Sequence, residues 1–167
     1  KYPQKAAAED KVTKTGTTDT TVVLTDEEKR TEKAGYVFDQ DNPNNVLTGT
    51  IAGDGSLVLK VYFKQQFTVT YAPGDHGTFE EQKTEAIDYG AVTPAAPTKE
   101  DITGDAGYTF TGWDKEIADK VTGNVTYTAQ WTANEHTQYT IEYYYQTEGK
   151  YPQKAAAEDK VTKTGTT

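Results

Sequence analysis

The clearest candidates for chemistry in this chain are the carboxylate and amide side chains of one short loop. Residues 39–45 read Asp-Gln-Asp-Asn-Pro-Asn-Asn, which places oxygen ligands at alternating positions, as calcium-binding loops do. Such loops also carry a glycine at the sixth position and a glutamate at the twelfth, where this chain has Asn44 and Thr50. An Asn/Asp-rich turn explains the same residues without an ion. We therefore expect a turn here, and no metal-binding residues.

Histidines and acidic runs are the next candidates, as acids, bases or paired carboxylates. His76 and His136, the only histidines, fall in polar loops without the i, i+4 partner of a zinc-binding helix or a visible nucleophile. The pair Glu80 and Glu81 and the run 26–28 could mimic glycosidase carboxylates, but charge preference at a helix start explains the second run. We expect both histidines to be exposed loop residues. No catalytic or cofactor-binding residue is expected, and the chain is not expected to be an enzyme.

Two further candidates for a chemical or binding role are a covalent isopeptide bond between Lys and Asn/Asp and a run of tyrosines. Such a bond commonly places its lysine on an early strand, and the expected opening strands at 67–74 and 139–146 contain none. Tyr143, Tyr144 and Tyr145 would alternate between two faces of a strand, so at least one ring would be exposed or covered by another module. Exposed rings can stack on sugars, but a sheet poor in aliphatic residues also needs rings for burial. We favour packing over glycan contact.

Composition and charge argue against nucleic acid and membranes as partners. The chain of 167 residues has a formal net charge of -9 at pH 7 and contains neither cysteine nor methionine. Its negative charge repels phosphate backbones and anionic lipid surfaces, and no apolar run approaches the length of a membrane span. Without cysteine, the fold has neither disulfides nor a thiolate zinc site.

Alternation of β-branched or aromatic residues with polar ones predicts a strand-rich fold. The strongest segments are residues 57–64, 67–71, 125–131 and 139–145, with shorter ones at 20–24, 35–38 and 107–110. Residues 53–56 are typical of a hairpin turn before a strand. One short helix is expected, starting with a capping box at Thr25 and ending at Gly35, and residues 98–101 weakly repeat its start signal. A helix of this length must pack on a sheet to be stable.

An internal repeat organises these elements. Residues 1–18, KYPQKAAAEDKVTKTGTT, recur letter for letter at 150–167, so the period is 149 residues and the chain is slightly more than one period of a tandem array. Two unequal copies of one plan fill each period, and each runs from an aromatic strand through Gly-Tyr-x-Phe to a closing aromatic strand. We expect one module at 1–66 that lacks its opening strand, a second at 67–136, and at 137–167 the opening strand and start of the next copy.

Two families share these motifs. The segments YTIEYYYQTEGKYP, KTGTTDTTVVLTDEEK, GYVFD and LTGTIAGDGSLVLKVYFK resemble the mucin-binding-protein (MucBP) repeat of Gram-positive cell-surface proteins. The segments FTVTY, GYTFTGWDKE and NVTYTAQW resemble the Listeria-Bacteroides repeat, also called the internalin B-repeat. The second match departs from the usual pattern at residues 74–77, where Gly-Asp-His-Gly replaces a glycine pair, and at the insertion 102–106.

The resemblance implies both a fold and a role. The fold would be α+β, with tandem β-grasp (ubiquitin-like) modules, strand-rich with one short helix each, forming an elongated rod. The protein would be a cell-wall-anchored bacterial surface adhesin, extracellular, in which this unit acts as a stalk or spacer. The alternative is a weak mucin- or glycan-binding module that works by avidity, with host mucin or glycans as candidate partners.

The phase of the repeat predicts one further contact. The opening strand from Tyr139 to Gln146 would lie beyond the second module, and the body that it completes is expected in a neighbouring molecule. We therefore expect head-to-tail strand exchange through Tyr139 to Gln146, with neighbouring repeats as partners and with Lys150 onward competing for the place that Lys1 onward occupies.

Overall fold

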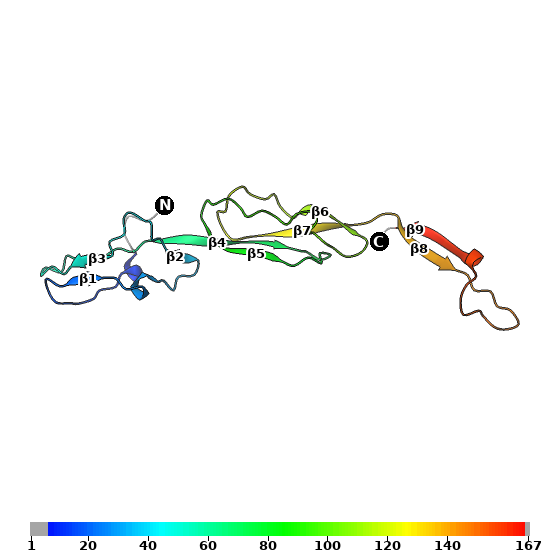
Figure 1. The fold of residues 1–167 in the computed structure, drawn as a ribbon, viewed down its shortest axis with the longest axis horizontal. Coiled ribbons are helices and arrows are strands. Elements are labelled where there is room, and N and C mark those ends of the chain that lie inside the picture. Colours follow the sequence, from blue (N-terminus) through cyan, green and yellow to red (C-terminus); the bar gives the residue numbers. More distant parts are fainter. Residues whose placement is uncertain (1–6, 166–167) are drawn as a thin grey trace. The chain divides into compact units, whose positions relative to one another are not determined.

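The fold consists of short strands joined by long irregular segments (Figure 1). The computed structural model describes residues 7–165. The strands are β1 (Thr21–Val23), β2 (Tyr36–Phe38), β3 (Thr48–Thr50), β4 (Phe63–Ala72), β5 (Gln82–Asp88), β6 (Tyr108–Trp113), β7 (Val125–Ala133), β8 (Thr137–Glu142) and β9 (Lys160–Gly165). Single 3-10 turns occur at η1 (Ala8–Asp10), η2 (Glu27–Lys29) and η3 (Ala157–Asp159). Over residues 7–165 there is no α-helix, and hence none that could cross a membrane.

The expected fold class, α+β tandem β-grasp modules with one short helix each, is wrong. Residues 7–165 form three separate sheets, with orders β1-β3, β2-β4-β7-β6 with β5 also on β4, and β8-β9. A β-grasp module needs a helix packed on its sheet, and the described residues provide none. An elongated rod of such modules is therefore not supported. The expected boundaries at 66/67 and 136/137 stay predictions.

The helix start signal at Thr25 forms, but the helix does not. The Thr25 backbone N–H donates to Glu28 Oε2 at 2.8 Å, and the Glu28 N–H donates to Thr25 Oγ1 at 3.3 Å, as in a capping box. After η2 the chain becomes extended at Arg30, with φ -94° and ψ 161°. Residues 25–35 contain no apolar side chain larger than that of alanine. A helix here would therefore have no apolar face to bury, and its stability in water would be marginal.

Strand boundaries differ from expectation at both predicted module junctions. The segments at 57–64 and 67–71 are not two strands, because β4 runs unbroken from Phe63 to Ala72 and residues 57–62 form only an isolated bridge, Val46 to Lys60. The segment at 139–145 shifts as well, since β8 ends at Glu142. Strands β3, β5 and β9 were not expected, because their sequences are polar or interrupted by glycine and lack aromatic alternation.

The contacts divide the chain into two compact units. One contains the chain up to Phe67 with Glu85–Ala91 and Lys120–Gly123, and the other contains the remainder. In the first unit, β1 pairs antiparallel with β3, and β2 pairs antiparallel with residues 63–65 of β4. Phe38 and Phe63 meet edge to face at 6.5 Å, but few large apolar side chains are buried here.

The second unit has an aromatic core on a sheet with mixed strand directions. Residues 69–72 of β4 run parallel to residues 125–128 of β7, and β6 pairs antiparallel with β7. Tyr71 lies at the centre, with its ring 5.3 Å from Tyr127 and 5.1 Å from Trp113. Phe110 lies between Trp113 and Trp131, at 5.5 and 5.7 Å. Ring packing thus replaces the aliphatic core that the composition lacks.

Three of the core rings have a polar group with a hydrogen-bond partner in a loop. The Tyr71 hydroxyl donates to the Pro94 carbonyl at 2.7 Å, the Tyr127 hydroxyl accepts the Ala118 N–H at 3.1 Å, and Trp131 Nε1 donates to the Pro73 carbonyl at 2.7 Å. Burial raises the pKa of Tyr71, so its hydroxyl stays protonated as a donor. These bonds attach three loops to the sheet: the one after β4, the one between β5 and β6, and the one between β6 and β7.

The third sheet is a hairpin formed by β8 and β9. The strands pair antiparallel over six residue pairs, from Thr137 opposite Gly165 to Glu142 opposite Lys160. Within the segment that joins them, Glu148 and Gly149 both have positive φ and are flanked by a pair of backbone hydrogen bonds, which is a type I′ turn.

The aromatic core generates the first prediction. Tyr71→Phe should lower the free energy of unfolding by about 1–3 kcal/mol, because the part-buried Pro94 carbonyl loses its donor. Tyr71→Ala should cost about 3–5 kcal/mol, because the whole ring is lost from the packed cluster. Chemical denaturation followed by the fluorescence of Trp113 and Trp131 measures both. Equal costs for the two variants would show that the ring contributes nothing beyond its hydroxyl.

Candidate functional site

The loop at 39–45 uses its polar groups to hold its own shape. The side chain of Asn42 is buried and donates to Asp39 Oδ2 at 3.3 Å. Asn45 donates from Nδ2 to the Asp39 carbonyl at 2.8 Å, while its Oδ1 accepts the N–H of Tyr62 at 3.0 Å. The amides therefore join the loop to the segment that enters β4. The bonding is that of an Asn/Asp-rich turn, and residues 7–165 contain no group of three or more histidine, cysteine, aspartate or glutamate side chains placed to hold a metal.

The surroundings of His76 differ from those expected from the sequence. It is half-buried, not an exposed loop residue: its ring stacks on Tyr108 at 3.6 Å, and Nδ1 lies 3.3 Å from Asp105 Oδ2. The His76 carbonyl also accepts the Asp105 N–H at 2.8 Å, and Thr78 bonds to Thr103 through both backbone and side chain. These contacts clamp the loop after β4 onto the insertion 102–106, a pairing that no local pattern could indicate.

The His76–Asp105 pair can do little catalysis in this setting. A general base must reach the proton of a nucleophile, but the nearby Thr78 hydroxyl is already bonded to Thr103. The imidazole and carboxylate are 37% and 52% exposed, so solvent screens the pair. Its geometry is that of a loop clamp.

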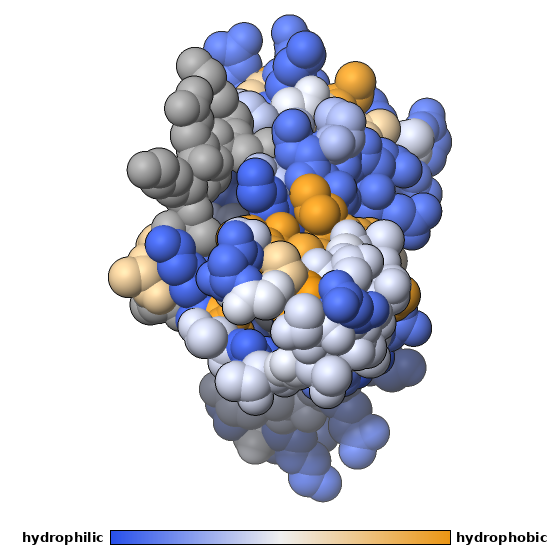
Figure 2. Space-filling model, turned by 90° about the vertical axis from the view of Figure 1, so that its left-hand side faces the viewer, coloured by the Kyte–Doolittle hydropathy of each residue, from blue (hydrophilic) through white to orange (hydrophobic). Residues whose placement is uncertain are grey.

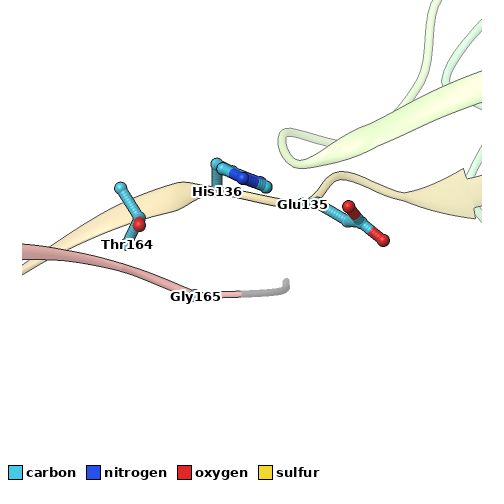
Figure 3. Close-up of a pocket in the computed structure, with 4 residues that line it drawn as sticks. All are labelled: Glu135, His136, Thr164 and Gly165. Atoms are coloured by element: carbon cyan, nitrogen blue, oxygen red, sulfur yellow. The ribbon is translucent and has the colours of Figure 1, made fainter.

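His136 lies where it was expected, exposed in the turn between β7 and β8. With Glu135, Thr164 and Gly165 it lines an open hollow of about 170 Å³ at the base of the hairpin. The side chains do not converge on one point (Figure 3), and Glu135 and Thr164 point in different directions. A ligand here would meet one face of protein and mostly water, so we assign no binding role to this hollow.

The acidic runs are engaged by nearby bases or exposed. Asp26 forms an ion pair with Lys29, and Glu27 forms one with Arg30, each three residues further along the chain. Glu28 pairs with Lys14, and the bonds from Lys14 and from Thr25 lower the pKa of Glu28 to about 2. Glu80 and Glu81 are exposed. The lowered pKa values of Asp26 and Glu28, caused first by their bonds to Lys29 and Lys14, favour the ionised form, the opposite of what a glycosidase acid requires.

One lysine–aspartate pair between neighbouring strands has the arrangement from which an isopeptide bond could form. The expected opening strand at 67–74 did not include its lysine. Because β4 begins at Phe63, it contains Lys64, whose Nζ lies 2.6 Å from Asp88 Oδ2 on β5. Hydrogen bonding to Asp88 raises the pKa of Lys64, and hydrogen bonding to Lys64, then to Gln66, lowers the pKa of Asp88. Amide formation needs a neutral amine and a protonated acid, so the surroundings favour the ion pair and oppose the bond.

The three tyrosines at 143–145 do not alternate across a strand. Because β8 ends at Glu142, they belong to the irregular segment that follows. All three are exposed, together with Tyr139 and Tyr151 of the same hairpin. The Tyr144 hydroxyl donates to Glu142 Oε2 at 2.6 Å. Within residues 7–165 these rings therefore lack the packing that was favoured over glycan contact, while their cover by another module stays a prediction. The hairpin carries the largest group of exposed rings in residues 7–165.

Comparison with known proteins adds no relative: no family model, no curated protein and no solved structure matches this chain.

The Lys64–Asp88 pair generates the second prediction. Asp88→Asn should lower the free energy of unfolding near neutral pH by at most about 1 kcal/mol, because both side chains are part-exposed. The lowered pKa of Asp88 means that its contribution is present above its ordinary pKa of 3.8 and is lost as the pH falls through the folded value. The raised pKa of Lys64 means that its contribution is present below 10.5 and is lost as the pH rises through the folded value.

Thermal denaturation of the wild type and Asp88→Asn across this pH range measures the difference. Glu81→Gln is the matched control, because it removes one negative charge at an exposed position. A difference between wild type and Asp88→Asn that persists unchanged at both extremes of pH would show that the ion pair is not its cause.

Proposed function

We propose that this chain is a repeat unit of a cell-wall-anchored bacterial surface protein, in which it acts as a stalk or spacer in adhesion. The observation that carries the proposal is the letter-for-letter recurrence of residues 1–18 at 150–167. Identity over such a stretch requires recent duplication, because surface segments otherwise drift in sequence. Arrays of near-identical units supply length and multivalency, and both serve a protein that must present something at a distance.

Several properties of the chain support an extracellular spacer. The absence of cysteine and methionine leaves few side chains that oxidation could damage. The net charge of -9 keeps neighbouring units soluble and apart. The candidate catalytic groups serve as loop clamps or surface ion pairs, as described above. The MucBP and B-repeat resemblance belongs to the same proposal, but the fold class that it implied does not.

A weak glycan-binding role is the second candidate, and the exposed tyrosines favour it. Tyr143, Tyr144, Tyr145 and Tyr151 all lie exposed between β8 and η3. Flat aromatic faces stack on sugar rings, and a weak site becomes effective when an array repeats it. Host mucin or other glycans would be the partners.

The spacer role predicts how the dimensions of an array grow. Chains of one, two and three periods should increase in maximum dimension by a constant step for each period added, because every junction repeats the same sequence. Small-angle X-ray scattering of the three chains measures this step. A maximum dimension that rises only as the cube root of mass would show that the periods collapse together and would sink the spacer proposal.

The glycan-binding role predicts saturable binding of a two-period chain to mucin, stronger than that of one period. Tyr145→Ala in every period should reduce this binding at least about tenfold if avidity multiplies the loss at each site. Tyr89→Ala is the matched control, since Tyr89 is 66% exposed and Tyr145 is 65% exposed. Equal effects of the two variants, or no binding by the two-period chain, would eliminate the second candidate and leave the spacer role.

A further inference from the structure

One six-residue sequence occurs in this structure in two states. Lys160–Gly165, KVTKTG, forms β9 against β8. The identical sequence at residues 11–16 takes part in no strand pairing among residues 7–165. The two copies have the same residues, so sequence does not explain why only one is a strand. The copy that forms a strand is the one that lies beside β8.

The unpaired copy begins with the same backbone shape as the paired one. The same 3-10 turn precedes both, at η1 and at η3. Lys11 has φ -104° and ψ 127°, and Lys160 has φ -111° and ψ 128°. Both values are extended, so the unpaired copy enters its segment in the same conformation as the paired one. An edge that is shaped in advance loses less conformational entropy on pairing.

The β8–β9 hairpin shows what the missing partner would supply. Lys160 forms an ion pair with Glu142 at 2.5 Å, and the Tyr139 ring lies beside Gly165, where no side chain obstructs it. Val161, opposite Ile141, is 40% exposed, whereas its counterpart Val12 is 81% exposed. The same valine thus remains open to water in one copy and is half covered in the other.

The surroundings of residues 11–16 hold the segment without pairing its backbone. Lys14 forms an ion pair with Glu28, and Gly16 packs against the Ile51 side chain. Val23 and Val58 of the same unit are 66% and 63% exposed. Figure 2, which faces the end of Figure 1 where β1 and β3 lie, shows apolar side chains at the surface among hydrophilic ones. Exposed apolar surface and an open strand edge are each typical of an interaction site.

We propose that residues 11–16 accept the β8 strand, Thr137–Glu142, of a second copy of this chain. The register is that of the β8–β9 hairpin: Lys11 would lie opposite Glu142 and Gly16 opposite Thr137 of the second copy. The contact joins the beginning of one copy to the end of another, so it repeats without closing. In a tandem array the preceding period supplies the same strand.

Competition within each copy limits this association. β8 already pairs with β9, and exchanging one KVTKTG for an identical one adds no pairing energy. Residues 11–16 also contact Glu28 and Ile51, and exposed valines of the same unit offer apolar surface to a second copy. Removing β9 from the competition should therefore increase association.

Because the two copies are identical, the same substitution can be made in either one. We expect opposite effects on association. The Tyr143 N–H donates to the Asp159 carbonyl, so by the alternation of an antiparallel ladder Ile141 and Val161 also form a hydrogen-bonded pair. Val161→Pro removes the β9 donor and frees β8, whereas Val12→Pro makes the same change in the acceptor.

Sedimentation velocity across a concentration series is the measurement. Val161→Pro should raise the weight-average mass with concentration to the dimer and beyond, at least twofold above the wild type at the highest concentration, while Val12→Pro and the double variant stay monomeric. Equal behaviour of the two single variants, or a monomeric Val161→Pro at every concentration, would overturn the proposal.

Disulfide trapping gives a second readout in a chain that has no cysteine of its own. Thr140 and Thr162 form a non-hydrogen-bonded pair, whose Cβ atoms approach closely enough for a disulfide, and Thr13 is the counterpart of Thr162. In a glutathione buffer, a mixture of Thr13→Cys and Thr140→Cys chains should form the mixed dimer at least threefold faster than Thr13→Cys with Ile141→Cys, which is one residue out of register.

The alternative to the second-copy contact is pairing of residues 11–16 with β8 of the same chain. A chain with both Thr13→Cys and Thr140→Cys should form intermolecular products whose yield falls on dilution. A disulfide formed only within one molecule, at a yield independent of concentration, would assign the strand to its own chain and refute the second-copy contact. Mixed dimers no more frequent than with the out-of-register control would do the same. These outcomes do not depend on the spacer proposal.

Discussion

Every strand in this protein depends on a backbone partner, and the identical hexapeptides show this constraint directly. An extended segment exposes an N–H or a carbonyl at each residue and gains strand character only when another strand satisfies them. The sequence KVTKTG starts with an extended lysine after the same 3-10 turn in both copies, but it is a strand only at Lys160–Gly165, where β8 lies beside it. Local preference therefore sets the shape of the segment, and a distant segment determines whether a strand forms.

Where pairing alone is insufficient, aromatic rings with bonded polar groups complete the fold. The rings of Tyr71, Tyr127 and Trp113 pack on one another across β4, β7 and β6, and the hydroxyl of Tyr71 reaches a loop carbonyl. A chain with few aliphatic residues can build a core in this way, because each ring buries a large area and its polar edge does not remain unsatisfied. The histidine at position 76 follows the same logic at the surface, stacked on Tyr108.

The functional conclusion rests on repetition more than on any single side chain. Groups that could have done chemistry are used for structure: Asn42 and Asn45 hold a turn, and Lys64 and Asp88 hold two strands as ions. Much of what remains exposed is a ring-bearing hairpin, and an open edge of the same sequence as β9 lies in the other unit. Units with complementary ends of this kind suit an array whose product is length or multivalency.

The sequence alone determined the repeat, the turn chemistry and the approximate position of β4, β6, β7 and β8, because these depend on identity and on local alternation. It also predicted the capping box at Thr25, but not that the helix would stop after one turn, because a helix without an apolar face has nothing to pack against. The contacts of His76 with Asp105 and of Lys64 with Asp88 were decided only in the tertiary structure, as were β5 and β9. The physical reason is the same for each: their partners lie far away along the chain, and the strength of a backbone or side-chain hydrogen bond depends on what the fold brings within reach.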